Sequence, residues 1–240
     1  GRGGEVAVIP IAGTIANGPA GGSAPLLGSI TRDGDVVRAL ERAGKDSSVA
    51  GIVVRVSSPG GAVLASDRMH RAVTLAAKRK PLVVSFGDTA ASGGYYLACG
   101  APTILASPLT ITGSIGVFSG KVHLDGLYSK IGASTSTERT REQADASGSH
   151  RAWTEAEITA NRKLVASWYQ RFIRLVSEGR GLTEGVARER AQGRVYMGER
   201  ALALGLIDGH GSLWDAVQLI RRQADIHDDA PMRIRYPRGS

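Results

Sequence analysis

The sequence predicts an α/β fold built on a mostly parallel sheet, and two observations carry this prediction. Through the first two thirds of the chain, apolar runs of strand length alternate with segments of helical periodicity, the order expected of strand–helix–strand units. One of these runs, 49–56 (VAGIVVRV), is the continuous β-branched kind found in strands that are buried on both faces. With 240 residues the chain is long enough to bury a core, and we expect a single domain over 1–240.

The predicted elements follow one another at short spacing. We predict strands over 5–11, 49–56, 81–86, 103–106 and 115–118, and helices over 35–43 and 63–77. Residues 13–29 are rich in Gly, Pro and Ser, so we expect a flexible loop there. The SSPGG sequence at 57–61 predicts a turn.

The last third of the chain is more helical. Helices are predicted over 155–177, from Thr183 onward and over 213–223. Thr154, with Glu157 three residues later, predicts a capping box at the start of the first of these helices. Residues 228–240 are polar and contain proline, so we expect a frayed tail.

Composition excludes several classes of protein. Hydrophobic residues make up 42% and charged residues 22%, which is typical of a globular chain and not of a disordered one. No apolar run approaches the ~20 residues that span a bilayer, and no leader pattern opens the sequence, so we expect any anchor to lie outside this piece. The net charge of +8 is spread out and aromatic residues make up 5%, so we expect no nucleic-acid partner. A diffuse positive surface is compatible with nearby anionic lipid.

No metal or cofactor site is predicted. The sequence has no H-E-x-x-H, no C-x-x-C and no G-x-G-x-x-G after a strand, and its one cysteine, Cys99, cannot form an internal disulfide. The GVFSGK segment at 116–121 lacks the spacing of a phosphate-binding loop and has Val122 where a Ser or Thr is required. The five histidines are scattered, although a Ser–His pair formed in space stays an alternative.

The most informative segment is 89–96 (TAASGGYY), which follows a predicted buried strand. Small residues around Ser92 permit a sharp strand-to-helix turn that projects its hydroxyl into a cleft. The N–H of Gly93 could then bind an oxyanion. The alternative is that Ser92 only caps the following helix.

Two further segments strengthen the catalytic interpretation. The SPGG sequence, with Gly60 and Gly61, also follows a strand. Because ligands of parallel sheets gather at the carboxyl ends of strands, this segment and Ser92 could face one cleft and share the oxyanion donors. The TGSIGV sequence places Ser114 between glycines, where its hydroxyl could hold the group that deprotonates Ser92.

SPGG, AASGGYY and ITGSIGVF, in this order and spacing, closely resemble the motifs of the signal peptide peptidase A (protease IV) family of serine proteases. The later stretch 193–211 (GRVYMGERALALGLIDGHG) is similar to the C-terminal pattern of that family, so the resemblance covers nearly the whole chain. It implies a crotonase-like, Clp-protease-like α/β spiral of β-β-α units with a helical C-terminal third. One departure is Ser57, where relatives usually have Asn.

The resemblance also implies a reaction and roles for single residues. Members of the family cleave leftover signal peptides and other apolar, extended peptides with a Ser-Lys dyad. By motif match, Ser92 is the nucleophile, Gly93 with Gly60 or Gly61 forms the oxyanion hole, and Ser114 orients the lysine.

The lysine is missing from the place that the resemblance implies for it. In single-unit members it follows the serine, yet the matching stretch here, 134–149, holds arginine and no lysine, and a guanidinium stays protonated. Lys121 and Lys130, which follow the Ser114 motif, are the candidates for a base within this chain. The remaining lysines belong to or flank predicted helices.

Long members of the family contain two related halves, of which the amino half brings the lysine and the carboxyl half brings the serine. This chain resembles the carboxyl half. The resemblance therefore implies that an amino-terminal half of the same protein supplies the lysine and that several copies form a ring. It also implies association with the inner membrane, with the catalytic part on the periplasmic side.

Two other functions stay open at the level of the sequence. A crotonase-like acyl-CoA hydrolase or isomerase would combine similar backbone oxyanion donors with a carboxylate pair, for which Asp67 and Asp88 are the nearby candidates. A degenerate, non-catalytic peptidase would instead bind extended peptides along a sheet edge.

Overall fold

The computed structural model describes residues 4–18, 29–227 and 230–237. Contacts within the chain divide it into two compact units. The first unit is formed by Gly1–Gly116 together with Phe172–Ser240, and the second is formed by Val117–Arg171. The sheet belongs entirely to the first unit.

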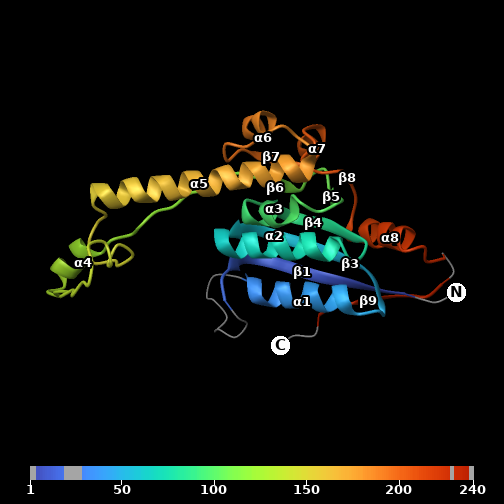
Figure 1. Ribbon diagram of the computed structural model, residues 1–240, viewed down its shortest axis with the longest axis horizontal. Coiled ribbons are helices and arrows are strands. Elements are labelled where there is room, and N and C mark those ends of the chain that lie inside the picture. Colours follow the sequence, from blue (N-terminus) through green and yellow to red (C-terminus); the bar gives the residue numbers. More distant parts are fainter. Residues whose placement is uncertain (1–3, 19–28, 228–229, 238–240) are drawn as a thin grey trace. The chain divides into compact units, whose positions relative to one another are not determined.

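Figure 1 shows the elements that these residues form. The strands are β1 (Gly4–Ala16), β2 (Ile30–Arg32), β3 (Val49–Gly61), β4 (Leu82–Ala91), β5 (Ile104–Ala106), β6 (Ile111–Gly113), β7 (Val195–Met197), β8 (Gly209–His210) and β9 (Met232–Arg235). The helices are α1 (Asp33–Lys45), α2 (Val63–Ala77), α3 (Gly93–Ala98), α4 (Asp125–Lys130), α5 (Glu155–Arg180), α6 (Glu184–Arg190), α7 (Gly198–Ala203) and α8 (Leu213–Gln223).

Every strand in the described part of the chain joins one sheet. The main path runs β2-β1-β3-β4-β5-β8, and each neighbouring pair along it is parallel. β9 pairs with the start of β1, and β6 pairs with the end of β4. The one antiparallel pair among them joins β6 and β7. The predicted mostly parallel α/β core is therefore confirmed.

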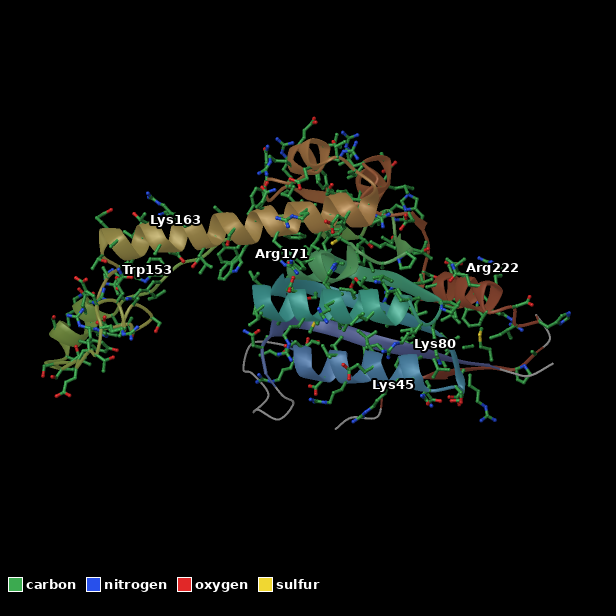
Figure 2. All side chains as sticks on the ribbon, viewed as in Figure 1. Lys45, Lys80, Trp153, Lys163, Arg171 and Arg222 are labelled. Atoms are coloured by element: carbon green, nitrogen blue, oxygen red, sulfur yellow. The ribbon has the colours of Figure 1, made fainter. Side chains whose placement is uncertain are left out.

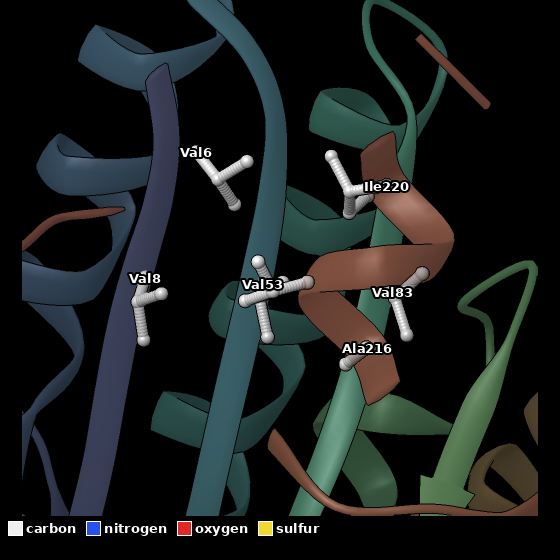
Figure 3. Packing of buried hydrophobic residues seen from close by; sticks show 7 residues of the cluster. Val6, Val8, Val53, Val83, Ala216 and Ile220 are labelled. Atoms are coloured by element: carbon white, nitrogen blue, oxygen red, sulfur yellow. The ribbon is translucent and has the colours of Figure 1, made fainter. Parts of the chain in front are cut away.

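Helices cover both faces of this sheet. Figure 3 shows α8 lying across the strands on one face, where Ala216 and Ile220 pack against Val53 and Val83. On the opposite face, α1 and α2 bury their own apolar stripes, including Leu40 and Met69. Burial of an aliphatic side chain of this size contributes about 1.5–3 kcal/mol, so the two layers fix the strands on which the loops described below depend.

One turn prediction and one strand prediction are corrected by the structure. Residues 57–61, predicted as a turn, are the last residues of β3 and pair with β1 and β4. The strand predicted over 115–118 is absent, and the strand of this region, β6, lies earlier at Ile111–Gly113. In both cases pairing partners distant in sequence, which a local pattern does not reveal, decide where the strand lies.

The predicted loop and tail also hold some regular structure. Residues 13–16 of the loop expected over 13–29 belong to β1, and residues 19–28 lie outside the described residues. In the tail expected over 228–240, Met232–Arg235 forms β9, while residues 228–229 and 238–240 lie outside the described residues.

The second unit contains α4 and the start of α5. The predicted capping box is present, because the Thr154 N–H donates to Glu157 Oε2 at 2.8 Å and the Glu157 N–H donates to Thr154 Oγ1 at 3.2 Å. Arg151 forms ion pairs with both Glu157 and Asp145, each at 2.7 Å. Across the described residues of both units, no helix combines the length and the apolar character needed to cross a bilayer.

Candidate active site

Ser92 lies between β4 and α3 with φ 50° and ψ −118°. A residue with a side chain seldom adopts this conformation, which costs on the order of 1–3 kcal/mol, so its surroundings must hold it in place. The Ser92 N–H donates to Gly113 O at 3.0 Å, and the Ser92 carbonyl accepts from the Tyr96 N–H at 2.8 Å. The Ser92 side chain is half-buried and makes no capping hydrogen bond, so the interpretation of Ser92 as only an N-cap is wrong.

Glycine is required after Ser92 because close neighbours leave no room for a side chain. A Cβ at Gly93 would lie 2.4 Å from Ser66 Oγ, and one at Gly94 would lie 2.8 Å from the carbonyl oxygen of Ser58. Both distances are well below the 3.5–4.0 Å of an ordinary non-bonded contact. Residues of α2 and of the end of β3 therefore enclose the turn.

The structure brings the SPGG segment against the Ser92 turn. Gly60 has φ 105°, and a Cβ on it would lie 2.6 Å from Gly93 N and 2.9 Å from Ser92 Cβ. A Cβ on Gly93 would in turn lie 3.1 Å from Gly61 N. The two glycine-rich segments that the sequence placed at strand ends are thus in direct contact.

The Gly60 N–H of SPGG is already held by a side chain. The Gly60 N–H donates to Ser58 Oγ at 3.1 Å, and the buried Ser58 hydroxyl itself donates to Gly13 O at 2.5 Å. The Ala62 N–H donates to Ile15 O of β1 at 2.9 Å. Gly61 N itself lies close to the Ser92 turn, 3.1 Å from where a Cβ on Gly93 would be.

Ser114 lies beside Ser92 at the ends of two paired strands. The register of β4 and β6 aligns Ala91 with Gly113, so Ser92 and Ser114 are the residues that directly follow these two strands. Ser114 has φ 49°, and its N–H donates to Arg194 O at 2.7 Å. The two serines share a positive φ near 50° and lie at the same end of the sheet.

The lysines of the first unit lie at the wrong end of the sheet to serve Ser92. Lys45, Lys78 and Lys80 end or follow α1 and α2, just before β3 and β4 begin, and Figure 2 labels two of them. Lys80 Nζ donates to the carbonyl oxygens of Asp46 and Val49, and burial lowers the pKa of its amine. Ser92 follows the opposite end of β4, whose ten residues span about 33 Å.

The two in-chain candidates for the base belong to the second unit. Lys121 Nζ donates to Ala146 O at 2.8 Å, and Lys130 is the last residue of α4. The first unit therefore brings together Ser92, Ser114 and the glycines of the predicted site, and neither candidate lysine is part of it.

The other side chains that could take part in catalysis are His70, Cys99, Asp67 and Asp88. The His70 ring lies against Tyr96, with Nδ1 at 3.1 Å from the Tyr96 carbonyl oxygen. Burial raises the pKa of the neighbouring Cys99 thiol to about 12, so this cysteine is not a thiolate nucleophile at neutral pH. Asp67 accepts a hydrogen bond from the Tyr96 hydroxyl at 2.8 Å, and Asp88 is exposed on β4.

The sequence interpretation missed three contributors to this site: Ser58, Ser66 and Arg194. The sequence indicates Ser58 only as part of a turn, yet its buried hydroxyl fixes the Gly60 N–H. Ser66 and the Arg194 carbonyl approach from segments distant in sequence, and no local signal marks them. Within the described residues, no group of three or more His, Cys, Asp or Glu side chains is arranged to hold a metal ion.

The sequence profile of peptidase family S49 matches residues 74–227. The chain is 34% identical to the chloroplastic serine protease SPPA of Arabidopsis thaliana over 92% of its own length and 33% of the relative. It is 38% identical to Protease 4 of Salmonella typhi over 90% of its own length and 34% of the relative. The chain thus spans about a third of the length of these relatives.

Solved structures of low sequence identity share the fold. A membrane-bound, stomatin-specific protease, 1510-N, superposes with a TM-score of 0.61 at 15% identity and with full coverage of both chains. ClpP1 of Listeria monocytogenes superposes with a TM-score of 0.56 at 17% identity, over 88% of this chain and 94% of that chain. The Clp-protease-like α/β fold is therefore confirmed. The profile match and the identity to relatives, together with the arrangement around Ser92, show that the chain belongs to peptidase family S49.

Proposed function

We propose that this chain is the serine-bearing part of a serine endopeptidase that works through a Ser-Lys dyad. The observation that supports the proposal most is the Ser92 turn. A half-buried serine is held in a strained conformation, and glycines of β3 press against it where a side chain would not fit. Such a turn presents the hydroxyl on one side and backbone N–H groups on the other, as acyl transfer requires.

In the proposed reaction, Ser92 Oγ attacks the carbonyl carbon of the scissile peptide bond while its proton passes to a neutral lysine amine. The new C–O bond leaves a negative charge on the carbonyl oxygen, which accepts hydrogen bonds from backbone donors, each worth about 3 kcal/mol. Collapse of this intermediate breaks the C–N bond, and the lysine returns the proton to the leaving amine. Water then attacks the acyl-enzyme carbonyl and gives a proton to the lysine, the C–O bond to Ser92 breaks, and the lysine returns this proton to Ser92 Oγ.

The backbone donors in this proposal are the N–H groups of Gly93 and Gly61. Gly61 is preferred to Gly60 because the Gly60 N–H already donates to the Ser58 hydroxyl. Gly61 N lies within 3.1 Å of where a Gly93 Cβ would be, so the two donors are close together. Ser114 is proposed to orient the lysine, since it follows the strand that pairs with the end of β4.

The lysine is proposed to come from an amino-terminal half of the same protein. Two observations favour this source over the lysines of the first unit. The lysines of the first unit lie at the opposite end of the strands, and the relatives named above are about three times as long as the matched region. A longer chain has room for a related half that carries the base.

The proposed substrates are signal peptides and other apolar, extended peptides. An exposed apolar strip supports this choice: Ile111 and Met197 face each other across β6 and β7, and Val195 lies opposite Gly113, whose carbonyl holds the Ser92 N–H. Leu109, 75% exposed, precedes the same strand. The ring of several copies and the inner-membrane, periplasmic location implied by the resemblance belong to the same proposal.

The proposal is tested by hydrolysis of an apolar fluorogenic peptide with the chain and the lysine-bearing half combined. Ser92→Ala is expected to lower kcat by roughly a thousand-fold or more, whereas Ser47→Ala, an exposed serine at the other end of β3, leaves it unchanged. Turnover of an acyl-CoA thioester that survives Ser92→Ala would contradict the proposal in favour of the crotonase-like reaction. Peptide binding without any turnover would favour the scaffold.

A further inference from the structure

The sheet edge at β1 carries a gap between two short strands. β9 pairs with β1 only at Gly4–Ala7, and β2 pairs only at Thr14–Ala16. Between them, the Thr31 hydroxyl accepts from the Ala12 N–H at 2.9 Å and donates to the Ala12 carbonyl at 2.8 Å. Among the described residues, no strand pairs with 8–11 on this side of β1.

Pro10 lies in the middle of this gap. The N–H groups of Ala12 and Thr14 both point to the side of β1 that carries the gap, because they donate to Thr31 Oγ1 and to Ser29 O on that side. By strand alternation Pro10 directs its carbonyl to the same edge. Proline has no N–H, so this position offers an acceptor without a donor beside it. A ligand that fills the gap must therefore bring an N–H group.

A groove of about 640 Å³ runs along the gap, between β1 and α1. Its apolar lining includes Ile9 of β1 and Val36 and Ala39 of α1. The volume lies within the ~300–1,000 Å³ typical of ligand sites. β3 lies between β1, which lines the groove, and β4, which Ser92 follows.

The charged residues that line the groove are mostly cationic: Arg32, Arg38, Arg42, Arg235 and Asp35. The single carboxylate is neutralised, because Asp35 pairs with Arg38 at 2.5 Å. Arg42 is exposed in the last turn of α1, and within the described residues it has no acidic partner. The groove therefore combines an apolar lining with a guanidinium that is available to a carboxylate.

We propose that this groove binds an extended acidic peptide segment as an added strand between β9 and β2. A peptide N–H donates to the Pro10 carbonyl, a side-chain carboxylate pairs with Arg42, and alternate apolar side chains lie against Ile9 and Val36. Main-chain pairing at an exposed edge, with alternate side chains read by pockets, is an established way for sheets to bind peptides. Phosphatidylglycerol, an anionic lipid, could meet the apolar lining and the arginine but would bring no N–H group for Pro10.

The test is fluorescence polarisation with the full chain and an acetylated, fluorescein-labelled hexapeptide of alternating Val and Glu. We expect saturable binding that falls about ten-fold or more in Arg42→Glu. Lys45→Glu makes the same charge change on the same helix outside the groove, and it is expected to change the affinity less than about two-fold. Circular dichroism checks that both variants fold, and Arg42→Ala provides a milder second variant.

Three further probes separate this proposal from general charge attraction and from lipid binding. A peptide with Gln in place of Glu, and one with N-methylated backbone amides, are each expected to bind about ten-fold more weakly. Equal binding of either peptide, or an equal loss in Lys45→Glu, would overturn the proposal. It would also be overturned if phosphatidylglycerol vesicles, and not the peptide, bound in an Arg42-dependent way.

Discussion

The candidate site depends on backbone conformations that single residues can hold only with help. Ser92 and Ser114 both have φ near 50°, and Gly60 has φ 105°. Each of the two serines donates its N–H to a carbonyl of another segment, Gly113 or Arg194. A local pattern of small residues suggested a turn at Ser92, but it could not show that the neighbouring segments enforce this conformation.

Gly60 is the position where we expect an added methyl group to lower the stability of the fold most. Gly60→Ala combines a strained φ with a contact to the Gly93 backbone, so it is expected to lower the free energy of unfolding by about 2–4 kcal/mol. The matched control is Gly185→Ala in the first turn of α6, where only Thr183 Oγ1 at 3.9 Å is near, and which should stabilise by about 0.5–1 kcal/mol. Urea unfolding of both variants measures the difference, and similar values for the two would contradict the account.

Ser58 tests whether the Gly60 N–H is held by a side chain. Ser58→Ala leaves the Gly60 N–H and the Gly13 carbonyl without their partner in a buried place. The expected loss is about 1–3 kcal/mol of unfolding free energy, against less than about 0.5 kcal/mol for the exposed Ser47→Ala. Equal stabilities of these two variants in urea unfolding would show that the hydroxyl does not hold the loop.

At the scale of elements, long periodic segments were predictable and short strands were not. The helices over 63–77 and 213–223 were predicted with the bounds that the structure gives to α2 and α8. β6 was displaced and β9 was missed, because three- or four-residue strands depend on partners that lie far away in sequence. For β9, ion pairs of Arg235 with Glu5 and Asp46 hold a polar segment on the edge of β1.

Part of the candidate site could likewise be predicted from the sequence, and part could not. Ser92, Gly93 and the SPGG glycines lie in motifs that could be read from the sequence, because tight turns at strand ends need small residues. Their contact with one another, and the distinction between Gly60 and Gly61, depend on pairing with β1 and on the Ser58 hydroxyl. Neither was visible without the structure.

The start of α5 is expected to lose stability in acid. The hydrogen bond from Arg151 lowers the pKa of Glu157 from 4.5 to about 2, and the same guanidinium holds the pKa of Asp145 below its ordinary value. Because these folded-state pKa values are lowered, the unfolded state binds protons first. The stabilisation is therefore complete above about pH 4.5 and is lost as the pH falls toward 2.

Hydrogen exchange over residues 145–160, corrected for intrinsic rates, measures this effect. Protection should fall between pH 5 and pH 3 in the unmodified chain, values that bracket the ordinary carboxyl pKa of ~4. Arg151→Gln should abolish most of that pH dependence, while Arg162→Gln, an exposed arginine on α5, should retain it. An unchanged profile in Arg151→Gln would contradict the assignment of the ion pairs.

At the scale of the whole molecule, the first unit carries the proposed nucleophile and no lysine near it. It holds the Ser92 turn, the proposed backbone donors and Ser114, and its lysines stand at the opposite end of β3 and β4. The chain also spans about a third of the relatives named above. Both facts agree with a dyad that is completed from outside this chain.

The most direct measurement is hydrolysis of an apolar fluorogenic peptide by this chain alone and then with the lysine-bearing half added. The account predicts no turnover by the chain alone and Ser92-dependent turnover once the second half is present. Ser92-dependent turnover by the chain alone, lost in Lys121→Ala or Lys130→Ala, would contradict it and would place the base within these 240 residues.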